Sequence, residues 1–159
     1  MPKFDELKFE PVIDPNLFAV TRCYTQYLFD QIPHRDWEVD SLYDCLPLFV
    51  ANPLNRFWAL TDIASKIKGF LWITIDPVVG MIAVNILTVD REYQNVNGSL
   101  SKTPSEIVKK VVEHLHKFQD ELKAKGGIEL KRKIFWSTAR PKAFERAGAK
   151  RHNRIIMEI

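Results

Sequence analysis

The spacing of apolar and polar residues changes several times along the chain, and each change marks a predicted element. Residues 9–13 form a short strand-like stretch that Asp14-Pro15 closes. Apolar positions then recur at helical spacing from Asn16 to about Gln31. A second helical pattern begins near Asp40 and ends before Asn52-Pro53. The first third of the chain is therefore predicted to contain one strand and two helices.

The middle of the chain changes to strand-like patterns. Residues 56–61 and 66–75 are rich in aromatic and aliphatic side chains, and residues 81–89 are nearly all apolar. A turn between Asp76-Pro77 and Gly80 predicts that the last two strands are antiparallel neighbours. A strand as apolar as 81–89, with Asn85 as its exception, is expected at the centre of a sheet, covered on both faces.

A long helix is predicted next, and its start has a clear capping signature. Thr103 suits the N-cap, Pro104 the first helical position, and Glu106 completes a Thr-x-x-Glu capping box. An apolar stripe runs from Ile107 to Leu122, and Gly126-Gly127 ends the helix.

The last part of the chain contains three further predicted elements: a strand over 130–137, a short helix over 141–146 and a final strand over 154–159. The element order indicates an α/β (α+β) fold, with a central mixed, mainly antiparallel sheet and helices on both faces. A length of 159 residues suits one domain, predicted here to span 1–159.

Charge is unevenly distributed, since Lys and Arg are concentrated after Leu100 although the net charge is only +3. Such asymmetry fits an anionic ligand, a nucleic acid or merely a solvated helix face. The sequence carries no RNA- or DNA-binding signature, which favours the solvated face.

The cysteine content and the apolar runs bear on location. Cys23 and Cys45 lie in apolar, helix-like surroundings, and two cysteines in a chain of this length make no disulfide framework. We therefore expect buried free thiols in a reducing compartment. No apolar run approaches the ~20 residues that span a bilayer, and residues 1–10 lack an apolar signal core. The predicted location is the cytoplasm, away from membranes.

Three short motifs resemble those of one enzyme superfamily. Gly69-Phe70 resembles a "G-F/Y" pair in a third strand, and residues 89–94 (Val-Asp-Arg-Glu-Tyr-Gln) resemble a "V-x-P-x-Y-Q" ending of a fourth strand. Residues 142–149 (Lys-Ala-Phe-Glu-Arg-Ala-Gly-Ala) resemble "A-x-x-F-Y-E-K-L-G-F" in a last helix. With the element order, these motifs resemble the GNAT superfamily of acyl-CoA N-acyltransferases.

The resemblance implies that acetyl-CoA, or another acyl-CoA, lies between strands 81–89 and 130–137, which splay apart in that fold. The backbone before Val89 would pair with the pantetheine arm, and the start of the long helix would hold the pyrophosphate. The implied cofactor-binding residues are Leu87, Thr88, Val89, Gln94, Gly98, Ser99, Lys102 and Thr103.

The loop of residues 94–99 departs from the family pattern. The family has Q/R-x-x-G-x-G/A, whose glycines let backbone N–H groups approach phosphate closely. This chain has Gln94-Asn95-Val96-Asn97-Gly98-Ser99, so only Gln94 and Gly98-Ser99 match. The loop is either an altered anion site or an ordinary polar loop before a capped helix.

Acid–base groups are also sparse. Asp90 and Glu92 are the carboxylates nearest the expected strand splay and are the candidate catalytic bases, although a strand-end carboxylate is more often simply solvated. Many family members have a Tyr four residues before the last helix's glycine, where its hydroxyl protonates the CoA thiolate. Here that position is Phe144, which has no proton to donate. The histidines form no recognisable metal-ligand set, so no metal is expected.

Two functions stay open at this stage. One is an acyl-CoA-dependent N-acyltransferase, an acetyltransferase for example, that acts on a small-molecule or protein amine. The other is a non-catalytic GNAT-like scaffold or assembly protein, such as a virion or complex component, that binds a protein partner or itself. The predicted strand-to-helix architecture favours the first function. The altered loop and Phe144 favour the second.

Overall fold

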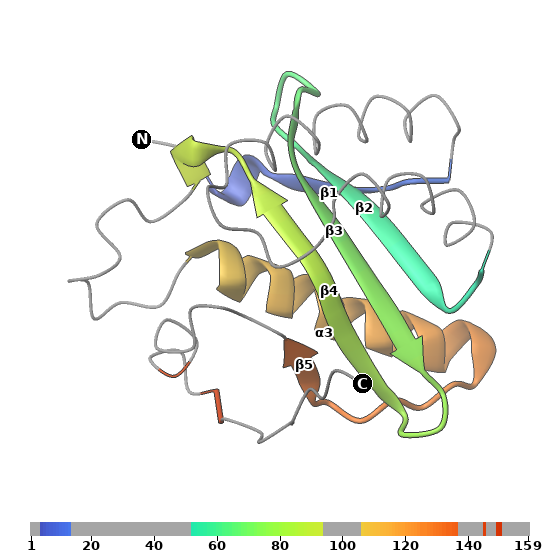
Figure 1. Ribbon diagram of the computed structural model, residues 1–159. Coiled ribbons are helices and arrows are strands. Elements are labelled where there is room, and N and C mark those ends of the chain that lie inside the picture. Colours follow the sequence, from blue (N-terminus) through green and yellow to red (C-terminus); the bar gives the residue numbers. More distant parts are fainter. Residues whose placement is uncertain (1–3, 14–51, 94–105, 137–144, 146–148, 151–159) are drawn as a thin grey trace, which may run out of the picture.

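The computed structural model describes residues 4–13, 52–93, 106–136, 145 and 149–150 (Figure 1). Five strands form one sheet in the order β1-β2-β3-β4-β5. Their bounds are β1 Lys8–Pro11, β2 Asn55–Thr61, β3 Ile67–Asp76, β4 Met81–Val89 and β5 Ile134–Trp136. Neighbours from β1 to β4 are antiparallel, whereas β5 is parallel to β4. The predicted mixed, mainly antiparallel sheet is confirmed.

The β3–β4 hairpin forms where the turn residues predict it. The Asp76 carboxylate oxygen Oδ1 accepts backbone N–H bonds from Val78 (3.0 Å) and Val79 (3.1 Å), as short polar side chains do in turns. Gly80 has φ +70°, a left-handed conformation that favours glycine. These contacts set the antiparallel register that runs from Asp76–Met81 to Gly69–Val89.

A β-bulge interrupts that register in the middle of β4. Trp72 lies opposite Ile86 and Ile73 lies opposite Val84, so Asn85 is the extra residue on the β4 side. Because one extra residue reverses the alternation of side chains, the positions of β4 that pack in the core change parity at the bulge. They are Ile82 and Val84 before it, and Leu87 and Val89 after it.

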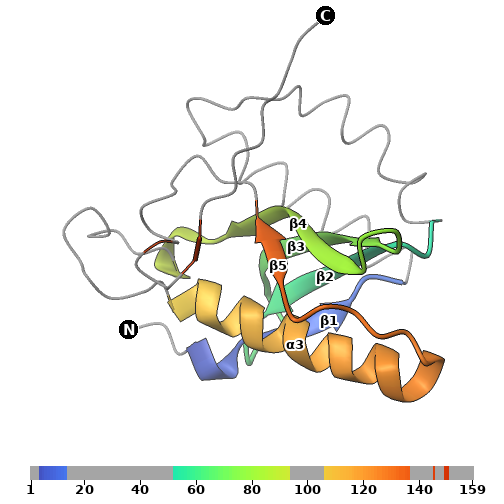
Figure 2. The same cartoon turned by 90° about the horizontal axis from the view of Figure 1, so that it is seen from below.

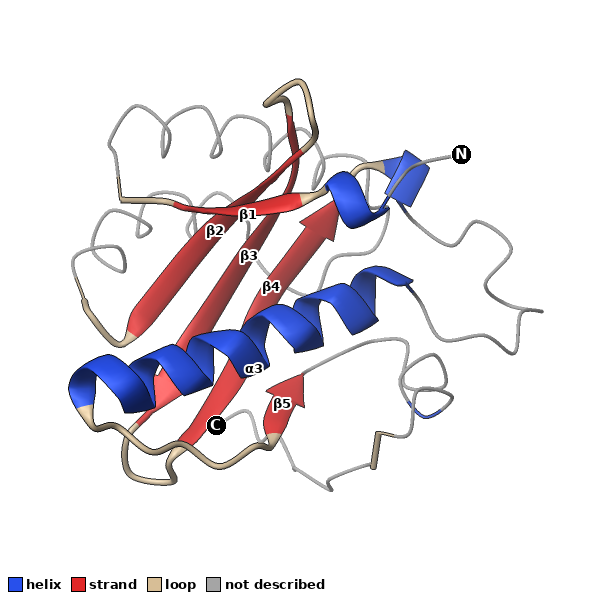
Figure 3. Ribbon diagram, turned by 180° about the vertical axis from the view of Figure 1, so that it is seen from behind, coloured by secondary structure: helices blue, strands red, loops and turns tan. Residues whose placement is uncertain are grey.

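Helix α3 (Glu106–Gly126) crosses one face of the sheet, as Figures 2 and 3 show. Its buried side chains are Ile107, Val111, Leu115 and Gln119, which follow one helical face. Gly127, at φ +65°, donates its N–H to the Lys123 carbonyl (3.1 Å) and ends the helix at the predicted glycines.

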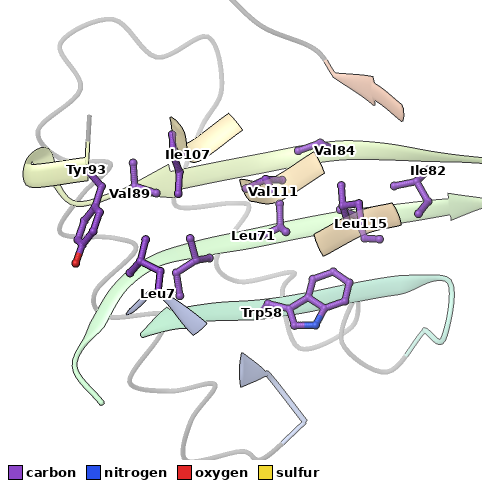
Figure 4. Close-up of a cluster of buried hydrophobic side chains, with 12 residues drawn as sticks. Leu7, Trp58, Leu71, Ile82, Val84, Val89, Tyr93, Ile107, Val111 and Leu115 are labelled. Atoms are coloured by element: carbon purple, nitrogen blue, oxygen red, sulfur yellow. The ribbon is translucent and has the colours of Figure 1, made fainter. Parts of the chain in front are cut away.

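The main core of the described residues lies between α3 and the sheet (Figure 4). Ile107 lies near Val89, and Leu115 lies near Ile82, so α3 runs from the end of β4 back toward its start. The strand residues of this core are Trp58, Leu60, Leu71, Ile73, Ile82, Val84 and Val89. None of the residues of β4 is exposed, as predicted for a central strand covered on both faces.

Polar contacts fix the connection between α3 and β5. The buried Gln119 donates from Nε2 to the Lys131 carbonyl (2.8 Å), and Arg132 donates from Nη1 to the His116 carbonyl (2.9 Å). The Lys131 N–H in turn donates to the Gly80 carbonyl (2.7 Å) in the β3–β4 turn. This connection therefore holds β5 beside the first half of β4.

Several predicted elements lie outside the described residues. They are the helices at 16–31 and 40–51, the helix at 141–146 apart from Glu145, the strand at 154–159, and the N-cap at Thr103. The described part places α3 on one face of the sheet, and helices on the other face stay a prediction. Among the residues described, none of the helices is both long and apolar enough to cross a membrane.

Candidate functional site

The candidate site is the edge of β4 on its β5 side, from the bulge at Asn85 onward. The parallel ladder joins Ile82 to Ile134, Ala83 to Phe135 and Val84 to Trp136. Trp136, the partner of Val84, is the last residue of β5 that the structure describes, and β4 continues to Val89 (Figure 1). The bulge residue Asn85 immediately follows Val84. Because bulges bend a strand and increase its twist, this is where we expect β4 to turn away from β5.

The backbone of β4 beyond the bulge has a defined orientation. The Asp90 N–H donates to the Lys68 carbonyl of β3 (2.7 Å). Successive residues of an antiparallel strand alternate between the two neighbouring edges, so the backbone groups of Thr88 also point to β3. Those of Leu87 and Val89 consequently point to the β5 side. Of the backbone positions before Val89 that are predicted to pair with pantetheine, Leu87 therefore faces the β5 side, whereas Thr88 faces β3.

Gly69 holds β3 unusually close to this part of β4. A Cβ atom at Gly69 would lie 2.5 Å from the Thr88 carbonyl oxygen and 3.1 Å from the Val89 Cγ1 atom. Contacts below about 3 Å between a Cβ and a backbone oxygen are repulsive. The glycine of the Gly69-Phe70 motif is thus required by the close approach of the two strands.

The candidate bases Asp90 and Glu92 lie just beyond β4, in the turn that contains the short helix η2 (Arg91–Tyr93). Asp90 accepts the Glu92 N–H at its Oδ1 atom (3.3 Å) and the Tyr93 N–H at its carbonyl (2.9 Å). The carboxylate of Glu92 forms an ion pair with the Lys68 ammonium (2.7 Å). Hydrogen bonding to Glu92 is the main cause that raises the pKa of Lys68.

Asp90 and Glu92 lie far from the bulge, which argues against their acting as bases on an amine bound there. Asp90 follows Asn85 by five residues, which corresponds to about 16 Å along an extended strand. The ion pair also keeps Glu92 next to a cation instead of an amine substrate. Asp90 and Glu92 thus lie at the helix end of the site, and their role as bases stays a prediction.

A polar network lies directly at the bulge, and sequence reasoning missed it apart from noting Asn85 as an exception. The Asn85 amide nitrogen Nδ2 donates to the Thr74 hydroxyl (2.6 Å), which donates to the Asn55 Oδ1 atom (3.1 Å). The Trp72 indole N–H donates to the same oxygen (3.0 Å). The available signals were Asn85 within the apolar run 81–89 and Thr74 within 66–75, whereas Asn55 precedes the predicted strand 56–61.

The predicted phosphate-binding residues lie outside the described part of the chain. These residues are Gln94, Gly98, Ser99, Lys102 and Thr103. Phe144 is outside it as well. Among the described residues, no group of His, Cys, Asp or Glu side chains is arranged to hold a metal ion.

Solved acetyltransferase structures share this architecture. A Clostridium difficile 630 protein described as a possible acetyltransferase matches with a TM-score of 0.63 and 11% identity over 96% of each chain. A candidate acetyl transferase from Pyrococcus furiosus gives 0.60 and 16%, over 97% of this chain and 99% of that one. The dodecameric spermidine N-acetyltransferase from Vibrio cholerae gives 0.55 and 11%, over 91% and 77%.

No family model matches the sequence, and neither does any curated protein sequence. At these identities the likeness to solved structures establishes the fold. The chain has the GNAT fold, the acyl-CoA N-acyltransferase fold that the motifs around Gly69 and Val89 predict.

Proposed function

We propose that this protein is an acyl-CoA-dependent N-acyltransferase that transfers an acetyl or other acyl group to an amine. The observation that carries the proposal is the bulge at Asn85, which bends β4 beside its described pairing with β5. Beyond the bulge the backbone groups of Leu87 point to the β5 side and suit an amide of a pantetheine arm.

The residues present fit an acyl-CoA. The Leu87 backbone would hold the pantetheine arm, because its N–H and C=O groups point to the β5 side. When bound, acyl-CoA would supply a thioester whose carbonyl carbon forms the new C–N bond as its C–S bond breaks. One amine proton ends on the released thiol, so the reaction needs no other reactant. Sheet and helix would contribute mainly orientation.

Calorimetric titration with acetyl-CoA tests the proposal, followed by measurement of thiol release in the presence of primary amines. We expect saturable binding with Kd below about 1 mM, equivalent to roughly −4 kcal/mol. CoA should also raise the melting temperature, because a ligand that binds only the folded state stabilises it. No heat of binding and no thermal shift at millimolar acetyl-CoA would refute the proposal.

A variant separates the phosphate contact from the pantetheine contact. Lys102→Ala is expected to weaken CoA several-fold and to leave the affinity for pantetheine, which lacks the pyrophosphate, unchanged. Lys125→Ala is the matched control, since Lys125 is an exposed lysine in the last turn of α3, at the far end from the predicted phosphate loop. Equal CoA affinity in all three proteins would remove Lys102 from the site.

The second candidate function is a non-catalytic relative that keeps the fold. Two features favour it: Glu92 is held by Lys68, and the position of the family's general acid is Phe144. Binding of acetyl-CoA without transfer to any amine, combined with self-association or capture of a protein partner, would identify this function. Measurable thiol release that depends on an amine would exclude it.

A further inference from the structure

The hydrogen-bond network at the bulge determines which atom of the Asn85 side-chain amide bonds to Thr74 and which atom does not. The indole N–H of Trp72 can only donate, so the Asn55 atom that it contacts must be the oxygen Oδ1. Thr74 Oγ1 lies 3.1 Å from the same oxygen and must donate its single hydrogen there, because two acceptors at that distance would repel each other. The Thr74 hydroxyl can therefore only accept from Asn85.

The donor to Thr74 must then be the amide nitrogen Nδ2 of Asn85, at 2.6 Å. This order of donors removes the usual ambiguity between the oxygen and nitrogen of an asparagine amide. The carbonyl oxygen Oδ1 of Asn85 is thereby directed away from Thr74. Asn85 is half-buried, and its Oδ1 atom is not among the buried side-chain atoms that lack a partner.

The network lies on the face of the sheet opposite α3. Leu71 and Ile73 belong to the core beneath α3, so Trp72 and Thr74, which alternate with them, point to the other face. Asn85 contacts Thr74 and shares that face. The start of α3, where the family resemblance puts the phosphates, is on the first face. An acceptor that approaches β4 at the bulge from the side not used by the cofactor meets the face that carries Asn85.

We propose that Asn85 positions the acceptor: its Oδ1 atom, held outward by Thr74, Asn55 and Trp72, accepts a hydrogen bond from the N–H of a primary amine. The inference rests on the proposed function and adds the residue that selects for an amine. An amide oxygen accepts hydrogen bonds but takes up no proton at neutral pH, so Asn85 orients the nitrogen and leaves the proton transfer to the amine and the thiol.

Steady-state kinetics with acetyl-CoA and spermidine or n-butylamine tests the assignment. Asn85→Ala is expected to raise the amine KM about tenfold, as for the loss of one hydrogen bond, with kcat and the acetyl-CoA KM within about twofold of wild type. Thr74→Val leaves the Asn85 amide free to rotate and should raise the amine KM by a smaller factor. Asn52→Ala is the control, since its amide oxygen also accepts one hydrogen bond, but from Leu54 in an exposed turn.

A second readout needs no active enzyme and no Asn85 variant. In the presence of CoA, which has no acyl group to transfer, saturating n-butylamine should shift the NMR signal of the Trp72 indole N–H through the hydrogen bonds that link it to Asn85. Trp72→Phe assigns that signal among the four tryptophans. A purely structural network would give no amine-dependent shift.

The possible failures are distinguishable. If wild type acylates the amines while Asn85→Ala keeps the wild-type KM, the role of Asn85 is refuted and the proposed function stands. An unchanged Trp72 signal at saturating amine refutes the role of Asn85 even if Asn85→Ala does not fold. If wild type binds no CoA, or transfers to no amine, the proposed function fails and this inference fails with it.

Discussion

His114 on α3 is a neutral histidine enclosed by aromatic rings, and we predict that it makes the protein sensitive to acid. Its ring stacks on Phe9, with ring centroids 4.0 Å apart and planes 6° apart. It also meets the edge of Trp58 at 4.8 Å. Its Nε2 atom is buried without a hydrogen-bond partner, so a proton added there would lack solvation. Burial, and secondarily the charge of Lys117, lowers the His114 pKa from 6.5 to about 4.

The size of the effect follows from this difference in pKa. Between pH 6.5 and about 4 the unfolded chain binds a proton at His114 that the folded chain does not. The free energy of unfolding therefore falls as the pH drops through this window, by up to about 3 kcal/mol in total. Of this, about 2 kcal/mol should be lost between pH 7 and pH 5.

His114→Phe tests this reasoning because phenylalanine keeps an aromatic ring but does not titrate. We would measure urea unfolding at pH 7 and pH 5 by tryptophan fluorescence. Carboxylates contribute equally in both proteins, so the difference between the two pH-dependent losses isolates His114. We expect the variant to lose about 2 kcal/mol less than wild type.

An equal loss of stability in wild type and His114→Phe would refute the argument. So would an NMR titration that gave His114 in the folded protein a pKa near 6.5. Either result would mean that the ring reaches solvent or finds a hydrogen-bond partner in solution.

Two further substitutions probe the β3–β4 pair that builds the candidate site. Gly69→Ala should destabilise the fold by about 2 kcal/mol or more, because its Cβ would lie 2.5 Å from the Thr88 carbonyl oxygen. An unchanged urea midpoint would contradict this, since it would show that β3 and β4 can move apart without loss of stability. Thr88→Val should raise the free energy of unfolding by about 1 kcal/mol, because the buried Thr88 hydroxyl has no hydrogen-bond partner. A lower midpoint for Thr88→Val would instead reveal a bound partner for that hydroxyl.

The sequence predicts the sheet well where the pattern and the turn chemistry agree. The bounds of β4 match the predicted strand 81–89, and the Asp76–Gly80 turn gives the antiparallel pairing. The predicted strand 130–137 is longer than β5, which spans Ile134–Trp136. The first residues of the predicted strand instead belong to the connection between α3 and β5, which hydrogen bonds of Gln119 and Arg132 hold in place. These bonds join residues that are distant in the sequence, so no local pattern predicts them.

The candidate site was harder to predict for a physical reason. A strand that is apolar on both faces has no alternation, so the sequence cannot show where its side chains change sides. The bulge lies within an apolar run, so the pattern of the sequence did not predict it. Asn85, the one polar residue near the middle of that run, was the only indication of its position. The network through Asn55 and Thr74 joins residues on three strands, and its existence depends on their registers.

The bulge also determines which insertions and deletions β4 can tolerate. Removing Asn85 would restore regular alternation and leave the side chains from Ile86 to Val89 on their present faces, because Ile73 would still pair with Val84 and Trp72 with Ile86. Removing Leu87 while the bulge stays in place would instead move Val89 out of the core beneath α3 and bring Thr88 into it. A deletion of one residue is therefore compatible with the core at the bulge and incompatible with it beyond the bulge. In related sequences we expect any one-residue difference in the length of β4 to fall at the position of Asn85.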